Sequence, residues 1–492
     1  MDQEFHDQID ALVNQMQIRL HQELDEALAW DVPGVLLTLE RTLLDLLLGL
    51  GSALIAVFLC AVHRQSSRIR EVQQHTRGQG YRNIGWRWTP ITTLFGGRHM
   101  VWTPYAVVDR RGKPGRPRGV GKRGVKGSGR FPLLEVLGCR AGATPALLGE
   151  VSSQLAWGPS EAAAVRRLAD RGIRLDPDTV RRLSYAIADE GLACREQALQ
   201  EGRPAPGSED IDLRDKRVVV TFDGGRVRTR SARKGRRRKN GYHGFETAWR
   251  MPRLLVIYGI DDQGRCLRHQ RPLYDGIITS ATQMFDLLRG HLQALHINQA
   301  SQVIFIADGA PEHWDSLPQL IQDVGLQPAQ VVQILDWAHA VEHLTTVADL
   351  CKGWSKKERE KWLKRQRTRL YRGQLQAVLN ELYDLAKGRR AKAIHTEIAF
   401  FEKHALRMRY AFFRNAHVPI GSGAVESAIR RVVNLRMKGN GIFWLDENPQ
   451  RMLFLRCQLL SLRWEDFLFA LLFPTQTPNQ PNEQPISWPL VA

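Results

Sequence analysis

The spacing of apolar residues changes along the chain, from helical periods near the amino terminus to short apolar runs in the middle. In residues 1–30, apolar side chains from Ile9 to Leu20 recur at the spacing of an amphipathic helix. A Pro-Gly pair at positions 33–34 then ends that pattern. We therefore expect a first helix that buries one face.

Residues 43–62 are apolar for nearly the length of a bilayer span. The run follows an amphipathic stretch with Glu40 and Arg41, contains Asp45, and stands alone in the chain. These features favour a soluble helix buried in a bundle or a dimer interface, so no membrane partner is expected. Association with a membrane is the alternative.

The next part of the chain combines a strand pattern with a strongly basic segment. Aromatic and β-branched residues between Tyr81 and Tyr105, with glycine breaks, predict short strands or a hairpin. Residues 110–130 contain nine Lys or Arg and no acid, and the remainder is mostly Gly, Pro and Ser, which cannot form a packed core. Around Arg116 and Arg118 this linker resembles a minor-groove AT-hook, although nonspecific phosphate contact is favoured.

Helical periods return after this linker. Ser160 and Asp176 are expected to begin two helices, the second over residues 179–189. Two helices joined by a short turn, with Arg181 and Arg182 on the second, fit a helix-turn-helix. The basic flanking sequence favours DNA binding, and a plain helical hairpin is the open alternative.

From residue 217 onward, after a linker at residues 201–209, apolar strands alternate with amphipathic helices. The strands are expected at residues 218–222, 254–260, 266–272, 302–307 and 331–335, and the helices at residues 282–295 and 317–324. Three strands, helix, strand, helix, strand is the order of an RNase H-like core. We therefore expect an α/β fold with a mixed sheet of this kind.

Three carboxylates stand where such a sheet presents functional side chains. Asp223 follows the first strand in the sequence VVVTFDGG, and Asp308 follows the fourth strand. Glu426 lies where a Gly-Ser-Gly segment leads into a helix. Each alone also fits a turn, an N-cap or a salt bridge. Together they fit phosphodiester cleavage with two Mg²⁺ (or Mn²⁺) ions about 4 Å apart, which take oxygen ligands.

The composition narrows the class of partner and the compartment. The 492 residues are 43% hydrophobic and carry a formal charge of +19, and such an excess most often serves a polyanion, nucleic acid first. The six cysteines form no CxxC pair, so neither a disulfide framework nor a cysteine zinc site is expected. The polar, acidic beginning of the chain is unlike a secretory signal peptide. We expect a reducing, cytoplasmic setting.

Several motifs occur together in residues 217–444. They are VVVTFDGG at 218–225, IFIADGA at 304–310, ILDWAHAVEHL at 334–344, VPIGSGAVES at 418–427 and RMKGNGIFW at 436–444. Trp444 follows Glu426 after 444 − 426 = 18 positions. In this combination the stretch resembles the DDE transposases of bacterial insertion sequences, of the ISKra and ISLre sort. The amino-terminal half is similar only in general character.

The resemblance implies that Asp223, Asp308 and Glu426 are the catalytic and metal-binding triad. The partners would be DNA, namely the terminal inverted repeats of an element and target DNA, and a homo-oligomer, at least a dimer, would pair the two ends. Cleavage would expose a 3′ hydroxyl that attacks target DNA, in the bacterial cytoplasm at the nucleoid. The alternatives are a catalytically inactive or repurposed DNA-binding protein and an RNase H-like nuclease without strand transfer.

Asp336 and His339 match an Asp-x-x-His motif of that family near the active site. With Trp444 they are therefore expected to support the site. His343 lies one helical turn after His339, a spacing that can chelate zinc, but no third ligand cluster accompanies the pair. A histidine packed in the core is also open.

Basic side chains are expected to contact DNA. They are Arg116, Arg118, Arg181, Arg182, Arg233, Lys234, Arg236, Arg237, Arg238, Lys239, Arg430 and Arg431. Half of them belong to the arginine-rich run 226–239, for which a solvated charged loop is the alternative.

The interval between the second and third carboxylates predicts an insertion. It spans 426 − 308 = 118 positions, too many for an uninterrupted core, and its basic, helical pattern fits an all-helical insertion. We expect a helical oligomerisation region (1–80), a region of short strands and the basic linker (81–131) and a helical DNA-binding domain (132–200). The catalytic core would follow in two parts (201–344 and 416–472), separated by the helical insertion (345–415), and the chain would end in a disordered tail (473–492).

Overall fold

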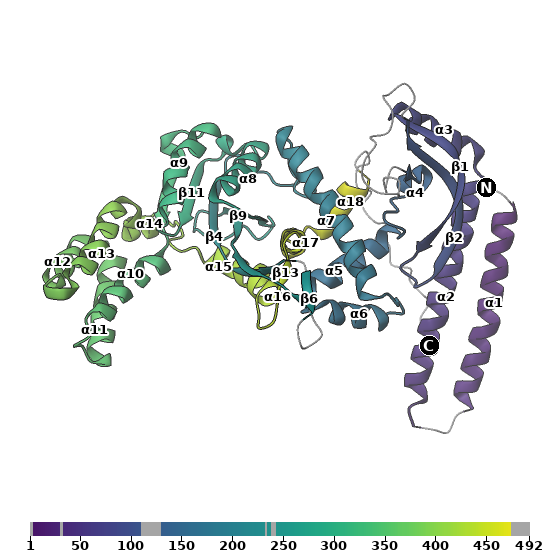
Figure 1. The fold of residues 1–492 in the computed structure, drawn as a ribbon, viewed down its shortest axis with the longest axis horizontal. Coiled ribbons are helices and arrows are strands. Elements are labelled where there is room, and N and C mark those ends of the chain that lie inside the picture. Colours follow the sequence, from purple (N-terminus) through teal and green to yellow (C-terminus); the bar gives the residue numbers. More distant parts are fainter. Residues whose placement is uncertain (1–2, 30–32, 110–128, 232–233, 238–242, 474–492) are drawn as a thin grey trace. The chain divides into compact units, whose positions relative to one another are not determined.

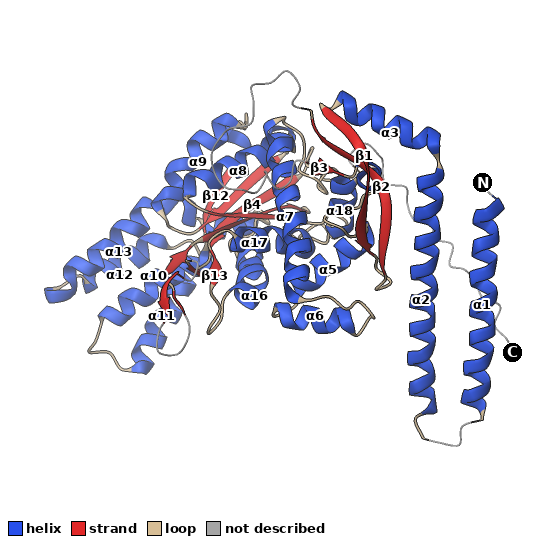
Figure 2. Ribbon diagram, turned by 45° about the vertical axis from the view of Figure 1, so that its right-hand side comes forward, coloured by secondary structure: helices blue, strands red, loops and turns tan. Residues whose placement is uncertain are grey.

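The computed structural model describes residues 3–29, 33–109, 129–231, 234–237 and 243–473. The chain divides into two compact units, residues 1–187 with 468–492 and residues 188–467, and each is described by itself. Figure 1 labels the helices and strands along the chain, and Figure 2 colours them by type. Helices and mixed sheets are both present, as expected for an α/β protein.

The amino-terminal unit begins with two long antiparallel helices, α1 (Gln3–Leu28) and α2 (Val35–Arg64) (Figure 1). The expected helix is confirmed by α1, but no residue of α1 is buried. The apolar run lies in α2, whose most apolar window has a mean hydropathy of 2.4 and is 6% buried. Among the described residues, α2 is the one helix long and apolar enough to cross a membrane, by length and composition alone. Leu37 and Leu47 are more than half exposed, so a single chain does not bury this run in a bundle.

An antiparallel sheet follows α3 (Ser66–Gly78). β1 (Tyr81–Thr92) pairs with β2 (Arg98–Val108), which confirms the expected hairpin. β3 (Gly129–Arg130) also pairs with β2, so the last two residues of the expected linker belong to the sheet instead. The expected DNA contacts Arg116 and Arg118 lie in residues 110–128, outside the described part of the chain.

Helices form the rest of this unit. They are α4 (Pro132–Val136), α5 (Pro145–Trp157), α6 (Glu161–Ala169) and the first half of α7 (Pro177–Gln200). The two expected caps are confirmed, because Ser160 and Asp176 each accept the backbone N–H three residues on, at 3.1 and 2.9 Å. The second helix was expected to end at residue 189 but continues to residue 200. Gly191 does not stop it; its missing side chain allows close packing, since a Cβ there would lie 2.6 Å from Phe454.

The second unit is built on a five-stranded mixed sheet with strand order β10-β9-β4-β11-β12. Its strands are β4 (Arg217–Gly224), β9 (Pro252–Ile260), β10 (Leu273–Ile278), β11 (Gln302–Ala307) and β12 (Val331–Leu335). β4, β11 and β12 are parallel, whereas β9 runs antiparallel to both β4 and β10. With α8 (Ala281–Ala294) and α9 (Pro311–Asp323), the strands and helices of this sheet follow the order expected from the sequence.

The third strand of the sheet is not where the sequence pattern placed it. Residues 266–272 were expected, but residues 268–270 form a turn and the strand is β10. β10 supplies the buried side chains Leu273 and Tyr274 to the sheet, whereas the expected segment is mostly polar or charged and cannot fill a buried position.

The helix expected from residue 317 begins earlier, at Pro311. Proline fits the first helical position, where no backbone N–H is needed. Pro318, expected near the start, therefore lies inside α9. The expected stop is confirmed, because Gly325 follows the helix with a positive φ of 71°.

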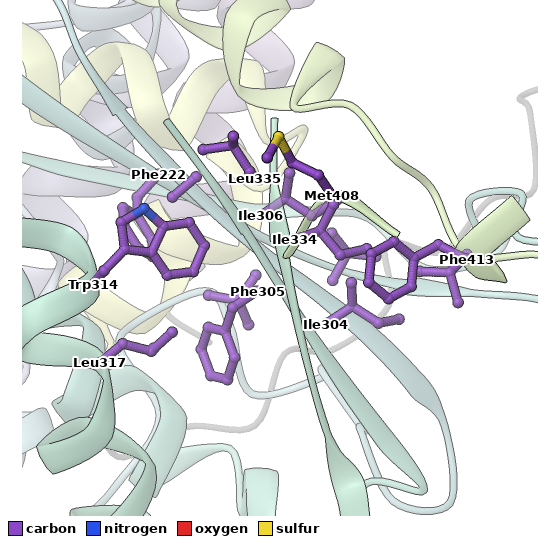
Figure 3. Close-up of a cluster of buried hydrophobic side chains, with 14 of the residues drawn as sticks. Phe222, Ile304, Phe305, Ile306, Trp314, Leu317, Ile334, Leu335, Met408 and Phe413 are labelled. Carbon is purple, nitrogen blue, oxygen red and sulfur yellow. The ribbon is translucent and has the colours of Figure 1, made fainter. Parts of the chain in front are cut away.

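Side chains from both faces of β11 fill the core of this unit (Figure 3). Phe305 lies on the side of Leu317 from α9, and Ile304 lies on the side of Phe413 from the helical region. All four are buried. Because successive side chains of a strand point to opposite faces, two packed layers fix β11 and the residue that follows it, Asp308.

The expected insertion is helical. Its helices are α10 (Trp337–Leu350), α11 (Lys356–Tyr371), α12 (Leu375–Leu385), α13 (Ala391–Lys403) and α14 (Tyr410–Asn415). After it come α15 (Gly423–Ala428), the π-helical η5 (Ile429–Asn434), α16 (Leu435–Met437), α17 (Asn448–Leu460) and α18 (Trp464–Leu472). Side chains of and just after α17 cover the edge strand β10: Gln450 accepts the N–H of Ile278 at 2.8 Å, and Ser461 that of Tyr274 at 3.3 Å.

The arginine-rich run 226–239 contains strands rather than a plain loop. β5 (Val227–Arg230) lies between β13 (Trp444–Leu445) and β8 (Thr247–Arg250), and β6 (Lys234–Arg237) pairs with β7 (His243–Gly244). Val227 and Thr229 are buried between arginines, so β5 has the period of two of a half-buried strand. The high charge of the run masks this alternation.

Candidate active site

Asp223 and Asp308 lie at the carboxyl ends of two neighbouring parallel strands. β4 and β11 pair with Thr221 opposite Ile306, and two residues further along this register Asp223 stands opposite Asp308. Adjacent strands are about 4.8 Å apart. The structure therefore brings these two predicted site residues together, at the centre of the sheet rather than on distant edges.

The Asp223 carboxyl is held in an environment that disfavours its charge. Burial raises its pKa above the ordinary value, and the nearby Asp308 carboxylate raises it further. The backbone N–H of Gly224 donates to Asp223 Oδ1 at 2.6 Å, which opposes the rise without cancelling it. A partly buried negative charge next to a second one is a place where a cation would be stabilised.

Asp308 is held by the first turn of α9. The N–H of Ala310 donates to Asp308 Oδ1 at 3.0 Å, and His313 Nδ1 donates to the same oxygen at 2.7 Å. Burial by itself would raise the pKa of Asp308, but the His313 hydrogen bond and charge, with the Ala310 bond, bring it below the ordinary value. Trp314 Nε1 also donates to the Asp308 carbonyl at 2.6 Å, which fixes the backbone. Asp308 Oδ2 takes no part in the hydrogen bonds of the side chain with His313 and Ala310.

Asp336 is fully buried and caps α10. Its Oδ2 accepts the backbone N–H of His339 at 3.0 Å and the His339 Nδ1–H at 2.9 Å. Its Oδ1 accepts the N–H of Ser422 at 2.5 Å. Burial would raise the pKa of Asp336, but these bonds outweigh it and lower the pKa below its ordinary value. A buried carboxylate with this many donors is stable as an anion.

His339 carries the positive charge of this group. The hydrogen bond to Asp336 raises its pKa to about 9, against the opposing effect of burial, and the Asp308 carboxylate adds to the rise. His339 in turn favours the charged form of Asp223. The expected support pair Asp336 and His339 therefore lies near the two strand-end carboxylates, and the His339 imidazole favours the charged form of both.

Glu426 lies on α15 and is exposed. Ser422 Oγ donates to Glu426 Oε1 at 3.1 Å, so a continuous chain of contacts runs from Asp336 through Ser422 to Glu426. Among the described residues, no three His, Cys, Asp or Glu side chains gather closely enough to hold one metal ion. The structure thus joins Glu426 to the group through Ser422 and does not bring its carboxylate into one cluster with the other two.

The donor set fits a hard divalent cation in part. Asp223 and Asp308 offer carboxylate oxygens, the ligands that Mg²⁺ and Mn²⁺ prefer. A cation would offset the burial and the Asp308 repulsion that raise the pKa of Asp223. His343 Nδ1 donates to Glu397 at 2.6 Å, and its ring stacks on Phe400. Among the described residues, no group of three candidate ligands forms a zinc site around His339 and His343.

Phe400 also packs against the backbone beside Asp308. A Cβ on Gly309 would overlap the Phe400 ring, so this glycine allows α13 to approach the end of β11. The contact ties the helical insertion to the candidate site.

Trp444, expected to support the active site, is buried in the small sheet with β5. Its Nε1 donates to the Met437 carbonyl at 2.9 Å, and Arg436 lies over its ring at 5.2 Å. β5 begins three residues after Gly224, the last residue of β4. Trp444 therefore anchors the segment that follows β4, the strand of Asp223. The contacts of Trp444 given above include none of the three carboxylates.

The expected DNA-contacting side chains have different surroundings. Arg181 pairs with Glu161 and with Asp178, which ties α6 to α7. Arg182 donates to the Ala141 carbonyl at 2.8 Å. Arg430 is exposed, whereas Arg431 donates to the Tyr274 hydroxyl at 2.8 Å. The side chains of the run from Arg233 to Lys239 lie outside the described residues.

Two residues of the site were missed from the sequence. His313 follows Asp308 by five positions and orients it from α9, and the helix-starting Ala-Pro-Glu-His order was the available signal. Ser422 lies in the Gly-Ser-Gly segment that was read only as the approach to Glu426, but it bridges Asp336 and Glu426.

Comparisons with known proteins add little to this geometry. No protein-family model matches the chain, and no curated protein does. A chain in the crystal structure of a pre-cleavage Mos1 transpososome is similar over 55% of this chain and 79% of that chain, with 12% sequence identity and a TM-score of 0.15. At that TM-score the similarity carries no argument about fold or function.

Proposed function

We propose that the chain is a DNA transposase of the DDE kind, with an RNase H-like catalytic domain. The observation that carries the proposal is the adjacency of Asp223 and Asp308 at the ends of the two central parallel strands. Two partly buried carboxylates at this position suit a metal-dependent phosphoryl transfer. The formal charge of +19 suits a DNA substrate.

In this proposal Asp223 and Asp308 would hold Mg²⁺ or Mn²⁺, with Glu426 as the third ligand. Bound metal ions would supply activation of the attacking oxygen and stabilisation of the leaving oxygen. His313 holds Asp308 in place through one oxygen. Ser422 holds Glu426 on α15, and release of that hydrogen bond would free the carboxylate to join the pair.

The protein would bind the terminal inverted repeats of its element, expose a 3′ hydroxyl and join it to target DNA, in the bacterial cytoplasm. Pairing two ends requires at least a dimer, and the exposed apolar side chains of α2 favour this helix as the interface. Replacing Leu37 and Leu47 by Glu should then lower the molar mass measured by light scattering. Co-sedimentation of the wild-type chain with membranes would contradict this part of the proposal.

The test is cleavage of a duplex that carries the inverted repeats flanking the gene, with Mg²⁺ or Mn²⁺. The wild-type protein should nick the repeat end, and Asp223→Ala and Asp308→Ala should abolish nicking without weakening DNA binding. Asp261→Asn is the matched control, because Asp261 follows β9 at the opposite end of the same sheet. Its asparagine can still accept the turn hydrogen bonds from Gln263 and Arg265.

A second arm separates the rival functions. A pre-cut end should be joined to plasmid DNA if the protein is a transposase. Cleavage without joining would identify an RNase H-like nuclease, and binding without cleavage in either metal would identify an inactive or repurposed DNA-binding protein.

A further inference from the structure

A pocket of about 590 Å³ lies in the amino-terminal unit between α2 and the β1–β2 hairpin. Its walls include three tryptophans, Trp86 and Trp88 from β1 and Trp102 from β2, with Leu59 and His63 from α2. This volume falls in the range of small-molecule sites, about 300–1,000 Å³. None of these residues belongs to the candidate active site.

The tryptophans are arranged to present ring faces rather than to fill a core. Trp86 and Trp102 stack with centroids 6.5 Å apart and planes 22° apart, and Trp88 lies 5.4 Å from Trp102. Trp88 is 61% exposed and Trp102 is 46% exposed. Large exposed aromatic faces beside a hollow favour a planar ligand that stacks on them.

The polar groups of the pocket favour a ligand with N–H donors and a negative charge. His63 Nδ1 donates to the Leu59 carbonyl at 2.6 Å, so its Nε2 is an acceptor, and this nitrogen has no hydrogen-bond partner among the described residues. Burial lowers the pKa of His63 and keeps the ring neutral. Arg98 lines the pocket and is exposed.

We propose that this pocket binds an unpaired nucleobase of DNA. The base would stack on Trp88 and Trp102, its amino group would reach the His63 side of the pocket, and its phosphate would meet Arg98. A base inside a duplex cannot enter, because both of its faces are stacked; a base in a single strand or turned out of a duplex can. The inference goes beyond the proposed cleavage, since it depends on neither Asp223 nor a metal ion.

The experiment uses the full-length protein in EDTA, where no cleavage occurs. The probes are a short single-stranded oligonucleotide with one 2-aminopurine, the same strand with an abasic position in its place, and the matching duplex. Trp88→Ala and Trp102→Ala should each weaken single-strand binding about 5- to 100-fold, as for lost base–aromatic stacking. Duplex binding should stay within twofold, and the abasic strand should bind wild-type protein as weakly as the intact strand binds Trp88→Ala.

Three controls make the result specific. Trp157→Ala removes an equally exposed tryptophan, on α5, outside the pocket and should change nothing. Trp88→Phe keeps a stacking face and should retain most of the single-strand binding. The loss in Trp88→Ala would then come from the missing aromatic ring and not from a folding defect. Asp261→Asn, outside the candidate active site, should bind the single strand normally, and because EDTA prevents cleavage this test can succeed even if the proposed transposase activity fails.

Equal losses for single strand and duplex, or no loss for either, would overturn the proposal. A tryptophan fluorescence change with phosphatidylglycerol vesicles, lost in Trp88→Ala, but none with the oligonucleotide would also overturn it and assign the pocket to a membrane surface.

Discussion

The backbone N–H of Ser422 donates to the carboxylate of Asp336 at 2.5 Å, across 86 positions of sequence. Asp336 follows β12 and caps α10, whereas Ser422 leads into α15 and hydrogen-bonds Glu426. A single buried carboxylate therefore joins the last strand of the sheet, the first helix of the insertion and the segment that carries the third expected catalytic residue.

Replacing Asp336 by Ala should destabilise the second unit by about 2–4 kcal/mol. The change removes a helix cap and leaves the buried N–H of Ser422 without its acceptor. Native-state hydrogen exchange should show the loss in the amides of β11 and β12. The comparison variant is Asp176→Ala, which removes the exposed cap of α7; its effect should be smaller and should stay out of β11 and β12. Equal protection of β12 in wild type and Asp336→Ala would contradict the joining role.

His339 should titrate with a pKa of about 9 in metal-free protein, because its Nδ1–H is bound by Asp336. Since the folded-state pKa is raised, the resulting stability is fully present below the unfolded value near 6.5 and is lost as the pH rises from there through about 9. NMR titration of the imidazole in EDTA measures the pKa directly. Asp336→Asn should return it to 6.5 or below, and an unchanged pKa in that variant would exclude Asp336 as the cause.

The sequence predicted the strands that carry Asp223 and Asp308 because their local signals agree. Each is a short apolar run that ends at Asp-Gly, so strand and stop coincide. β5 was hidden because charged residues hold its exposed positions, and only Val227 and Thr229 mark the buried face. The third strand of the sheet was predicted too early in the sequence, at residues 266–272. The polar turn that precedes β10 begins there with residues whose pattern also fits a strand.

The contacts that organise the candidate site could not be predicted in the same way. Ser422 donates to Asp336 through its backbone N–H, and His313 donates to Asp308 through a ring nitrogen. Any loop or helix could carry such donors. Such pairings are decided by tertiary packing, which local propensity and periodicity do not contain. The resemblance of motifs identified which carboxylates to examine, but not the hydrogen bond between Ser422 and Glu426.

A buried charge group of α7, α8 and β10 should be a main determinant of stability in the second unit. Asp275 accepts from Arg195 at 2.9 Å and from His291 at 2.7 Å, and all three side chains are buried. Asp275→Asn should cost about 3–5 kcal/mol, because it removes the buried charged partner of Arg195 and leaves that guanidinium only the exposed Glu196, 3.7 Å away. Denaturant titration measures this loss in the free energy of unfolding, and hydrogen exchange of the β10 amides shows where it falls. The exposed pair Asp212–Arg214 gives the control, since Asp212→Asn should leave the midpoint unchanged. A loss for Asp275→Asn no larger than for Asp212→Asn would refute the assignment.

Asp223→Asn and Asp308→Asn should change the stability of the metal-free protein in opposite directions at pH 7. The raised pKa of Asp223 means that its charge costs stability above that pKa, so the neutral amide should raise the unfolding midpoint. The lowered pKa of Asp308 means that its charge contributes stability above the unfolded-state pKa, so its loss, with the His313 bond weakened, should lower the midpoint.

The same two variants should respond alike to a divalent cation. Mg²⁺ or Mn²⁺ that binds the folded state should raise the wild-type midpoint in proportion to the logarithm of its concentration. Asp223→Asn and Asp308→Asn should both lose this increase, while Asp261→Asn should keep it. Differential scanning fluorimetry with and without metal measures the unfolding midpoints of the wild type and the three variants. If Asp223→Asn destabilises the metal-free protein, the two carboxylates do not repel each other, and if both variants keep the metal response, the cation binds elsewhere.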